Sequence, residues 1–153
     1  MNDKAREYWD EFWQGFGQKQ IISAEQFGYA DIADELAQLI VDGKKTATCS
    51  IYSLYEIENE PLPAVGQYTI VLSSKDDPVA IVRTSEVLIV KMNEVPEELA
   101  LAEGEGDLTY QYWWNSHKEA FTAELGEHGM DFREDMLLVF EKFELVDVNR
   151  NEP

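Results

Sequence analysis

The sequence predicts an α+β fold, a small mixed β-barrel with flanking helices, formed by a single domain over residues 1–153. Three observations lead to this prediction. The chain has 153 residues, the length of one ordinary domain, and its 44% hydrophobic content suffices for a sizeable core. Helical periodicity dominates the first part of the chain, whereas long apolar strand patterns dominate the middle and recur at the end. Because the strands are few and are joined by hairpins or by a helical insertion, a mixed barrel is favoured over a parallel α/β sheet.

Two helices are predicted in the first third of the chain. The first covers residues 3–16 and carries Trp9, Trp13 and Phe16 on one face. We interpret this aromatic stripe as core or as the contact surface of a homodimer, with a platform for a ligand as the alternative. The second covers residues 30–42, where leucines and isoleucines form a buried stripe and a glycine follows as a stop signal.

The predicted strands come next. Residues 43–51 form a turn that leads into a short strand, and residues 67–72 and 79–91 form a hairpin. The segment 79–91 is long for one strand, so we expect a bend or bulge near Thr84 and Ser85.

The last third of the chain is predicted to contain two helices and a strand. An acidic helix begins at Pro96 and continues to about Glu103, where glycines break it. A second helix covers residues 109–125, and residues 136–146 form the closing strand.

The charge of the chain limits its partners. Asp and Glu number 31 against 12 Lys and Arg, which gives a formal net charge of -19. Such a protein repels phosphate backbones at long range, which makes long DNA or RNA tracts poor candidates as partners. A small molecule, or a single nucleotide of RNA held locally, is left as the predicted ligand.

Composition also limits location and cofactors. No apolar run approaches the roughly 18 residues of a membrane span, and the N-terminus lacks a signal peptide, so we expect no membrane partner and a cytoplasmic location. A single cysteine, Cys49, excludes an internal disulfide framework and a cysteine-cluster zinc site. We expect no metal and no organic cofactor.

The segment 43–48 (GKKTAT) is the first candidate for chemistry, although it does not have the spacing of a phosphate-binding P-loop. It places Lys45 three residues before Thr48. A buried lysine with a lowered pKa can act as general base for a hydroxyl nucleophile. The structural alternative is a lysine that stabilises the negative end of the preceding helix dipole. The pair can meet only if Lys45 lies in the turn and the strand begins near Thr46.

Two further segments are candidates. Glu105 lies between two glycines, which suits either a carboxylate close to a ligand or a solvated acidic loop. Trp113 and His117 lie one helical turn apart with Trp114 adjacent, and they form either a core face or a stacking wall for a heterocycle. Arg83, in the middle of a strand, is expected either to pair with a buried acid or to bind a substrate carbonyl.

Taken together and in this order, five segments resemble the ASCH domain family, and more narrowly its bacterial branch with GKKT and EGEGD signatures. They are GKKTAT at 43–48, VGQY at 65–68, RTSEV at 83–87, AEGEGD at 102–107 and the final strand. The resemblance covers residues 25–147 and leaves residues 1–24 as an N-terminal aromatic helical extension. It implies a PUA-like β-barrel with a cleft beside it, in a family associated with RNA and modified nucleosides.

One branch of that family hydrolyses N4-acetylcytidine with a lysine, a threonine and a glutamate, which fall on Lys45, Thr48 and Glu105. The resemblance implies that a neutral Lys45 activates Thr48 for attack on the amide, while Glu105 orients the lysine or protonates the leaving amine. The substrate-binding residues that it implies are Lys44, Thr46, Arg83, Glu103, Trp113, Trp114 and His117. The alternative functions are a non-catalytic RNA-binding or regulatory module and, third, a ribonuclease.

Overall fold

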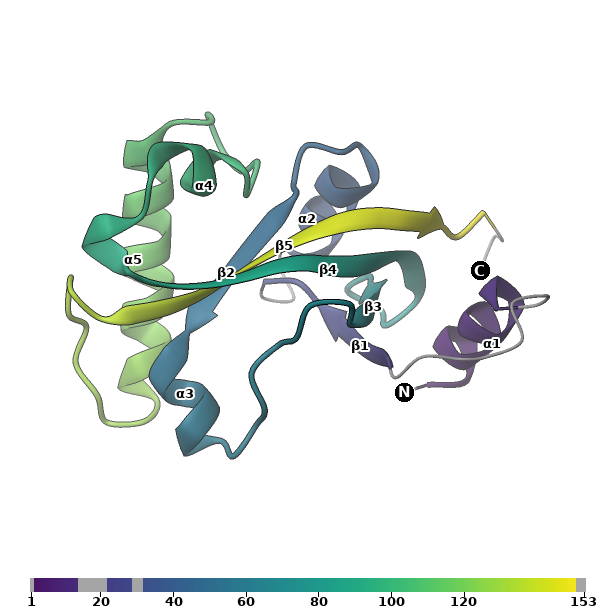
Figure 1. Cartoon of the computed structure of the whole chain (residues 1–153), viewed down its shortest axis with the longest axis horizontal. Helices are drawn as coiled ribbons and strands as arrows, with labels where there is room; N and C mark the ends of the chain where they lie inside the picture. The colour runs from purple at the N-terminus through teal and green to yellow at the C-terminus, as the bar shows by residue number, and fades with distance from the viewer. Residues whose placement is uncertain (1, 14–21, 29–31, 151–153) are drawn as a thin grey trace.

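The computed structural model describes residues 2–13, 22–28 and 32–150 (Figure 1). The predicted α+β architecture is confirmed as a curled five-stranded half-barrel sheet with flanking helices. The helices are α1 (Asp3–Phe12), α2 (Ala33–Val41), α3 (Tyr52–Ile57), the 3-10 turn η1 (Met92–Glu94), α4 (Glu97–Leu101) and α5 (Tyr110–Gly126). The strands are β1 (Ile22–Gln26), β2 (Ala47–Ile51), β3 (Tyr68–Leu72), β4 (Pro78–Lys91) and β5 (Leu137–Val148).

The strand order is β1-β3-β4-β5-β2, so β1 and β2 are the two edges of the sheet. The β1–β3 pair is parallel, whereas β3–β4, β4–β5 and β2–β5 are antiparallel. The long strands β4 and β5 run side by side through the centre of the molecule (Figure 1). The β4–β5 register shifts between Thr84 and Glu86, which confirms the predicted bend near Thr84 and Ser85. Such bulges increase local twist and curl a sheet.

Strand β1, helix α3 and the short turn η1 were not predicted from the sequence. Strand β1 has the sequence ISAEQ, whose composition is mostly polar and small, and its strand conformation follows from parallel pairing with β3. Helix α3 is short and contains tyrosines and isoleucine, which also suit strands, and its first turn has no side-chain cap. The predicted first helix was too long, because α1 ends at Phe12; the residues expected to continue it, 14–16, lie outside the described part of the chain.

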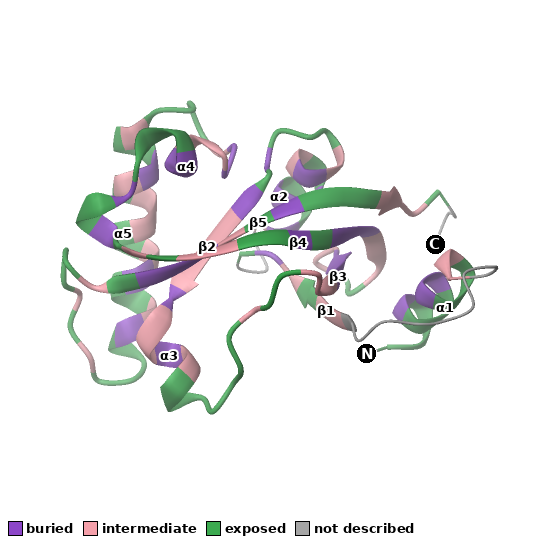
Figure 2. Cartoon of the chain, in the orientation of Figure 1, coloured by how far each residue is buried: buried purple, intermediate pink, exposed green. Residues whose placement is uncertain are grey.

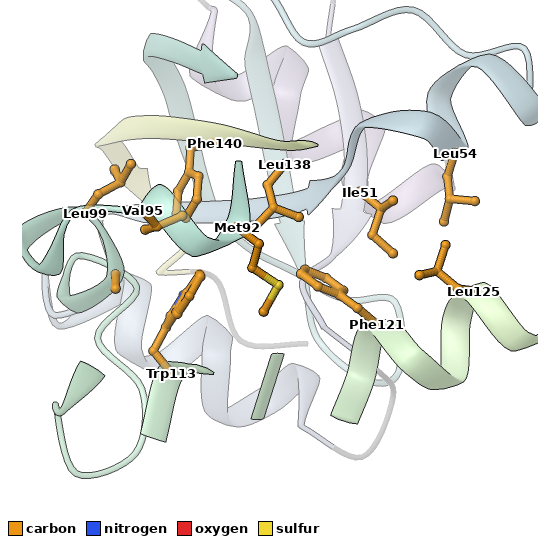
Figure 3. Close-up of a cluster of buried hydrophobic side chains, with 11 residues drawn as sticks. Ile51, Leu54, Met92, Val95, Leu99, Trp113, Phe121, Leu125, Leu138 and Phe140 are labelled. Carbon is orange, nitrogen blue, oxygen red and sulfur yellow. The ribbon is translucent and has the colours of Figure 1, made fainter. Parts of the chain in front are cut away.

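Buried side chains form a core on either side of the sheet. One cluster lies between β2, β5, α4 and α5, where Trp113, Phe121 and Phe140 pack around Met92 (Figure 3). Figure 2 shows that α1 and α2 each bury one side, whereas the loop between α3 and β3 is exposed along most of its length. Among the described residues, no helix is both long and apolar enough to cross a membrane.

The aromatic stripe of α1 packs on its own chain. Tyr8 and Trp9 are buried against Ile70 and Ile81 of the sheet, so the core interpretation of this stripe is confirmed. The Tyr8 hydroxyl donates a hydrogen bond to Asp147 on β5, over 2.7 Å. A homodimer through this helix stays a prediction.

Candidate active site

Backbone hydrogen bonds fix Lys45 in the turn between α2 and β2. The backbone N–H groups of Lys44 and Lys45 donate to the carbonyl of Leu39, near the end of α2. The N–H groups of Thr46 and Ala47 donate to the carbonyl of Ala102, just after α4. Because β2 begins at Ala47, Lys45 precedes the strand, which is the condition that the sequence set for a Lys45–Thr48 pair.

The loop after α4 brings two carboxylates to Lys45. Gly104 has φ +68, a left-handed conformation, and a Cβ at this position would lie 2.1 Å from the backbone oxygen of Lys44. Only glycine permits this contact between the two backbone segments without strain. The close approach places Glu103 and Glu105, on either side of Gly104, next to the same lysine.

Lys45 is 2% exposed and forms two ion pairs. Its Nζ donates to Glu105 Oε2 over 2.9 Å and to Glu103 Oε1 over 3.3 Å. Burial by itself lowers the pKa of the ammonium, but the carboxylates of Glu103 and Glu105 outweigh it and raise that pKa above its usual value. The expectation of a neutral Lys45 is therefore wrong for the resting protein, because two carboxylates hold the proton on the amine.

Glu103 is the most enclosed charge of the site. Its carboxylate is 2% exposed and accepts hydrogen bonds from Lys45, the Cys49 thiol, the Trp113 indole and His117. Burial raises the pKa of this carboxyl, but the positive charges of Lys45 and His117 and the hydrogen bonds lower it from 4.5 to about 2. Glu103 is thus ionised throughout the physiological range.

The His117 ring is fixed at both nitrogens. Nε2 lies 3.1 Å from Glu103 Oε2, and Nδ1 lies 2.8 Å from the backbone oxygen of Trp113. Burial lowers the pKa of this imidazole, but the Glu103 carboxylate outweighs it and raises the pKa above its usual value. Because both nitrogens also face acceptor oxygens, the geometry and the raised pKa favour the doubly protonated imidazolium form.

Cys49 is a neutral thiol. Its Sγ donates to Glu103 Oε2 over 3.2 Å, and burial raises the pKa of the thiol well above its usual value. Because the thiolate is the reactive form, this cysteine is not the nucleophile of the site.

Cys49, Glu103 and His117 present ligand atoms within 4.8 Å of one another, and zinc accepts such donors. However, Glu103 Oε2 already accepts hydrogen bonds from the thiol, the imidazole and the Trp113 indole. Its other oxygen, Oε1, pairs with the Lys45 ammonium. A divalent cation would have to displace those protons beside a buried positive charge. We therefore assign these side chains to a hydrogen-bond network and not to a metal site.

A cavity of about 310 Å³ opens beside this network, between β2 and α5. It lies at the lower end of the roughly 300–1,000 Å³ range of small-molecule pockets. Of the residues expected from the sequence, Lys45, Thr48, Glu103, Glu105 and His117 line it. Among the described residues, no hydrogen bond joins the Thr48 hydroxyl to another side chain, so the hydroxyl is available to a ligand.

Among the described residues, the other side chains that were expected in the site do not line the cavity. Trp113 is 3% exposed and gives its indole proton to Glu103, and Trp114 packs against the same core, so neither forms the expected stacking wall. Arg83 is exposed on β4, opposite Tyr68 and Glu144, and is not among the residues that line the cavity, where the expected role beside the substrate carbonyl would place it. Lys44 and Thr46 are exposed, and the Thr46 hydroxyl bonds the backbone after α4.

Sequence reasoning missed several residues that line the cavity, among them Tyr112 and Ser116. Both lie on the face of α5 next to the core stripe that contains Trp113 and Phe121. The sequence contained a signal for this face of the helix, because residues 112, 116 and 120 recur every four residues and therefore lie on the same side of α5. Tyr112 is 41% exposed, and its ring lies beside Gly106 at the edge of the cavity.

Comparison with known proteins identifies close structural relatives. The sequence model of the ASCH domain matches residues 23–147. The crystal structure of protein EF3133 from Enterococcus faecalis V583 is 38% identical in sequence, with a TM-score of 0.87 over 97% of this chain and 91% of that chain. The ASCH domain from Lactobacillus crispatus JV V101 is 32% identical, with a TM-score of 0.88 and 96% of each chain covered. A search among curated proteins finds no match.

Proposed function

This chain belongs to the ASCH domain family, and from that premise we propose that the cavity beside Lys45 is the active site of an amidohydrolase. Its substrate is a small N-acylated nucleoside of the N4-acetylcytidine type. The observation that supports the proposal most is the partly buried Lys45–Glu105 ion pair in a cavity that Thr48 also lines. These side chains supply a base, an acid and a nucleophile, the groups that acyl transfer requires.

The first half of the reaction moves the acetyl group to the protein. Substrate entry removes water from the ion pair, which favours transfer of the proton from Lys45 to Glu105 and leaves both groups neutral. The neutral amine accepts the Thr48 proton as Thr48 Oγ bonds to the amide carbon. The C–N bond then breaks, and Glu105 gives its proton to the departing nitrogen. The products are the free nucleoside and an acetyl ester on Thr48, with Lys45 and Glu105 charged again.

The second half releases acetate. A water molecule attacks the ester carbon and gives one proton to the Glu105 carboxylate. The C–O bond to Thr48 breaks, and Lys45 returns a proton to Thr48 Oγ. Acetic acid leaves, and proton transfer from Glu105 back to Lys45 restores the resting ion pair. The overall change consumes one amide and one water and forms one amine and one acid.

Charge near the cavity supports a nucleoside over a longer nucleic acid. A neighbouring cavity of about 370 Å³ shares Ser50 and Glu124 with the first and is also lined by Glu58, Glu60 and Glu141. A phosphate in this position would meet carboxylates at close range, which costs several kcal/mol for like charges juxtaposed at a binding surface.

The test is to incubate the protein with N4-acetylcytidine and to measure cytidine and acetate. We expect both products in equal amounts, and a lower kcat/KM for the 5′-monophosphate of the same nucleoside. Absence of acetate, together with salt-dependent binding or cleavage of an RNA oligonucleotide, would replace this proposal by the RNA-binding or ribonuclease alternative.

Tyr112 is expected to stack on the base, in the place that the sequence assigned to Trp113 or Trp114. Replacing Tyr112 by alanine is expected to raise KM for N4-acetylcytidine by roughly 5–150-fold, the equivalent of about 1–3 kcal/mol for loss of one aromatic stacking partner. Tyr112→Phe keeps the ring and should keep KM near that of the unchanged protein. An equal rise in KM for both variants would show that the hydroxyl, and not the ring face, binds the substrate.

A further inference from the structure

We propose that Glu103 is the positioning residue of this site: its one carboxylate fixes the Lys45 amine beside Glu105 and holds His117 as a fixed imidazolium that binds no substrate. The part of this proposal that concerns Lys45 rests on the proposed function. The part that concerns His117 stands independently of any reaction.

The first argument is the number of donors that end on Glu103. Lys45 comes from the turn before β2, Cys49 from β2, and Trp113 and His117 from α5. Three of these donors end on Oε2 and Lys45 ends on Oε1, so both oxygens of the carboxylate have partners within the protein. The 2% exposure of Glu103 keeps both oxygens out of reach of a substrate. The residue that the family resemblance assigned to substrate binding acts instead through its neighbours.

The second argument is the geometry of His117. Its Nδ1–H donates to the carbonyl of Trp113 in the preceding helical turn, and its Nε2–H donates to Glu103. The ring stacks on the Trp113 indole, with centroids 4.9 Å apart and an interplanar angle of 26°. Both N–H groups are thus committed within the protein. The imidazolium contributes positive charge to the cavity wall, and it has no free proton to give to a ligand.

The third argument is the balance of charge. The titratable groups that face His117 are Glu103 and Glu105 from the loop after α4, Lys45 from the turn before β2 and Cys49 from β2. On its own helix, Glu124 lines the same cavity. With Glu103 present, the negative charges of Glu103 and Glu105 balance the positive charges of Lys45 and His117. Without that carboxylate, Glu105 alone would face both, and the histidine would lose its proton at a lower pH.

The test for His117 uses NMR titration, which is simple here because the chain has two histidines. In Glu103→Gln, a replacement of nearly the same size, we expect the titration midpoint of His117 to fall by about 1–3 pH units. Glu119→Gln removes an exposed carboxylate from the same helix and should leave that midpoint in place. An unchanged His117 midpoint in Glu103→Gln would overturn the proposal.

A second variant protects the test against misfolding. Glu103→Asp keeps the charge but is one methylene shorter, so it cannot reach all four donors. Its His117 midpoint is expected between those of the unchanged protein and Glu103→Gln. If Glu103→Gln does not fold, a Glu103→Asp midpoint equal to that of the unchanged protein would contradict the proposal.

The catalytic part is tested by separating kcat from KM. A positioning role predicts that Glu103→Gln lowers kcat for acetate release by about 10²-fold or more and leaves KM within about twofold. A large rise in KM with kcat retained would mean that Glu103 binds substrate, against the proposal. If the unchanged protein releases no acetate, the proposed function fails, but the titration still decides whether Glu103 holds His117.

Discussion

Replacing Lys45 by methionine is expected to lower the free energy of unfolding by about 3–5 kcal/mol, the usual cost of removing one partner of a buried ion pair. Methionine fills a similar volume but carries no charge. Glu103 and Glu105 then lose their ammonium partner while Glu103 stays buried. The same change removes the proposed base, so acetate release should fall by about 10²–10⁴-fold. Urea unfolding and the product assay measure the two effects.

Lys91→Met is the matched control, because Lys91 is exposed at the end of β4. This variant should unfold within about 0.5 kcal/mol of the unchanged protein, as is usual for exposed substitutions. If Lys45→Met were as stable as this control, the ion pairs at Lys45 would not contribute to the fold.

The stability loss in Lys45→Met is expected to depend on pH. Lys45 and His117 lower the pKa of Glu103 from 4.5 to about 2 in the folded protein. A carboxyl with a lowered folded-state pKa adds stability above its unfolded value, and that stability is lost as the pH falls through the folded value. In the unchanged protein the stability that Glu103 adds should therefore be full above about pH 4.5 and should be lost as the pH falls toward 2, and the deficit of Lys45→Met should shrink over that range.

Gly104→Ala is expected to destabilise the protein by more than about 3 kcal/mol, the upper end of the cost of an unfavourable backbone conformation alone. The added Cβ would lie 2.1 Å from the Lys44 carbonyl oxygen, which is backbone and cannot rotate away. Relief requires the loop to move from the turn, which separates Glu105 from Lys45. Activity should fall with stability even in the fraction that remains folded.

Gly43→Ala isolates the cause of this effect. Gly43 has φ +75, almost the conformation of Gly104, but a Cβ there would meet no atom within 4 Å. Its cost should be about 1–2 kcal/mol, from the left-handed backbone alone. Equal losses in the two variants would mean that contact with Lys44 does not determine the position of the loop.

The sequence predicted the parts of the fold whose patterns are local. The β3–β4 hairpin, the bend at Thr84 and the long helix α5 follow from strand patterns, strand length and helical periodicity. Strand β1 could not be predicted in this way, because its polar residues become a strand through pairing with β3, far away in the chain. The tertiary contact overrides the local preference.

In the candidate site, too, the features set by local sequence could be predicted, whereas those set by distant segments could not. The turn before β2 and the glycine loop after α4 carry their own conformational signals, so the placing of Lys45 and Glu105 was within reach of the sequence. The charge state of Lys45 was not, because it depends on two carboxylates that arrive from a distant loop. The aromatic wall was assigned to Trp113, whose helix face turns to the core, whereas Tyr112 on the adjacent face lines the cavity.

The central claim is that the Thr48 hydroxyl attacks an amide in the cavity beside Lys45. The most direct measurement is kcat/KM for acetate release from N4-acetylcytidine by Thr48→Val, which keeps the shape of the side chain and removes the hydroxyl. The account predicts a loss of at least about 10³-fold, with Thr48→Ser retaining measurable turnover. A Thr48→Val protein that releases acetate at the rate of the unchanged protein would contradict it.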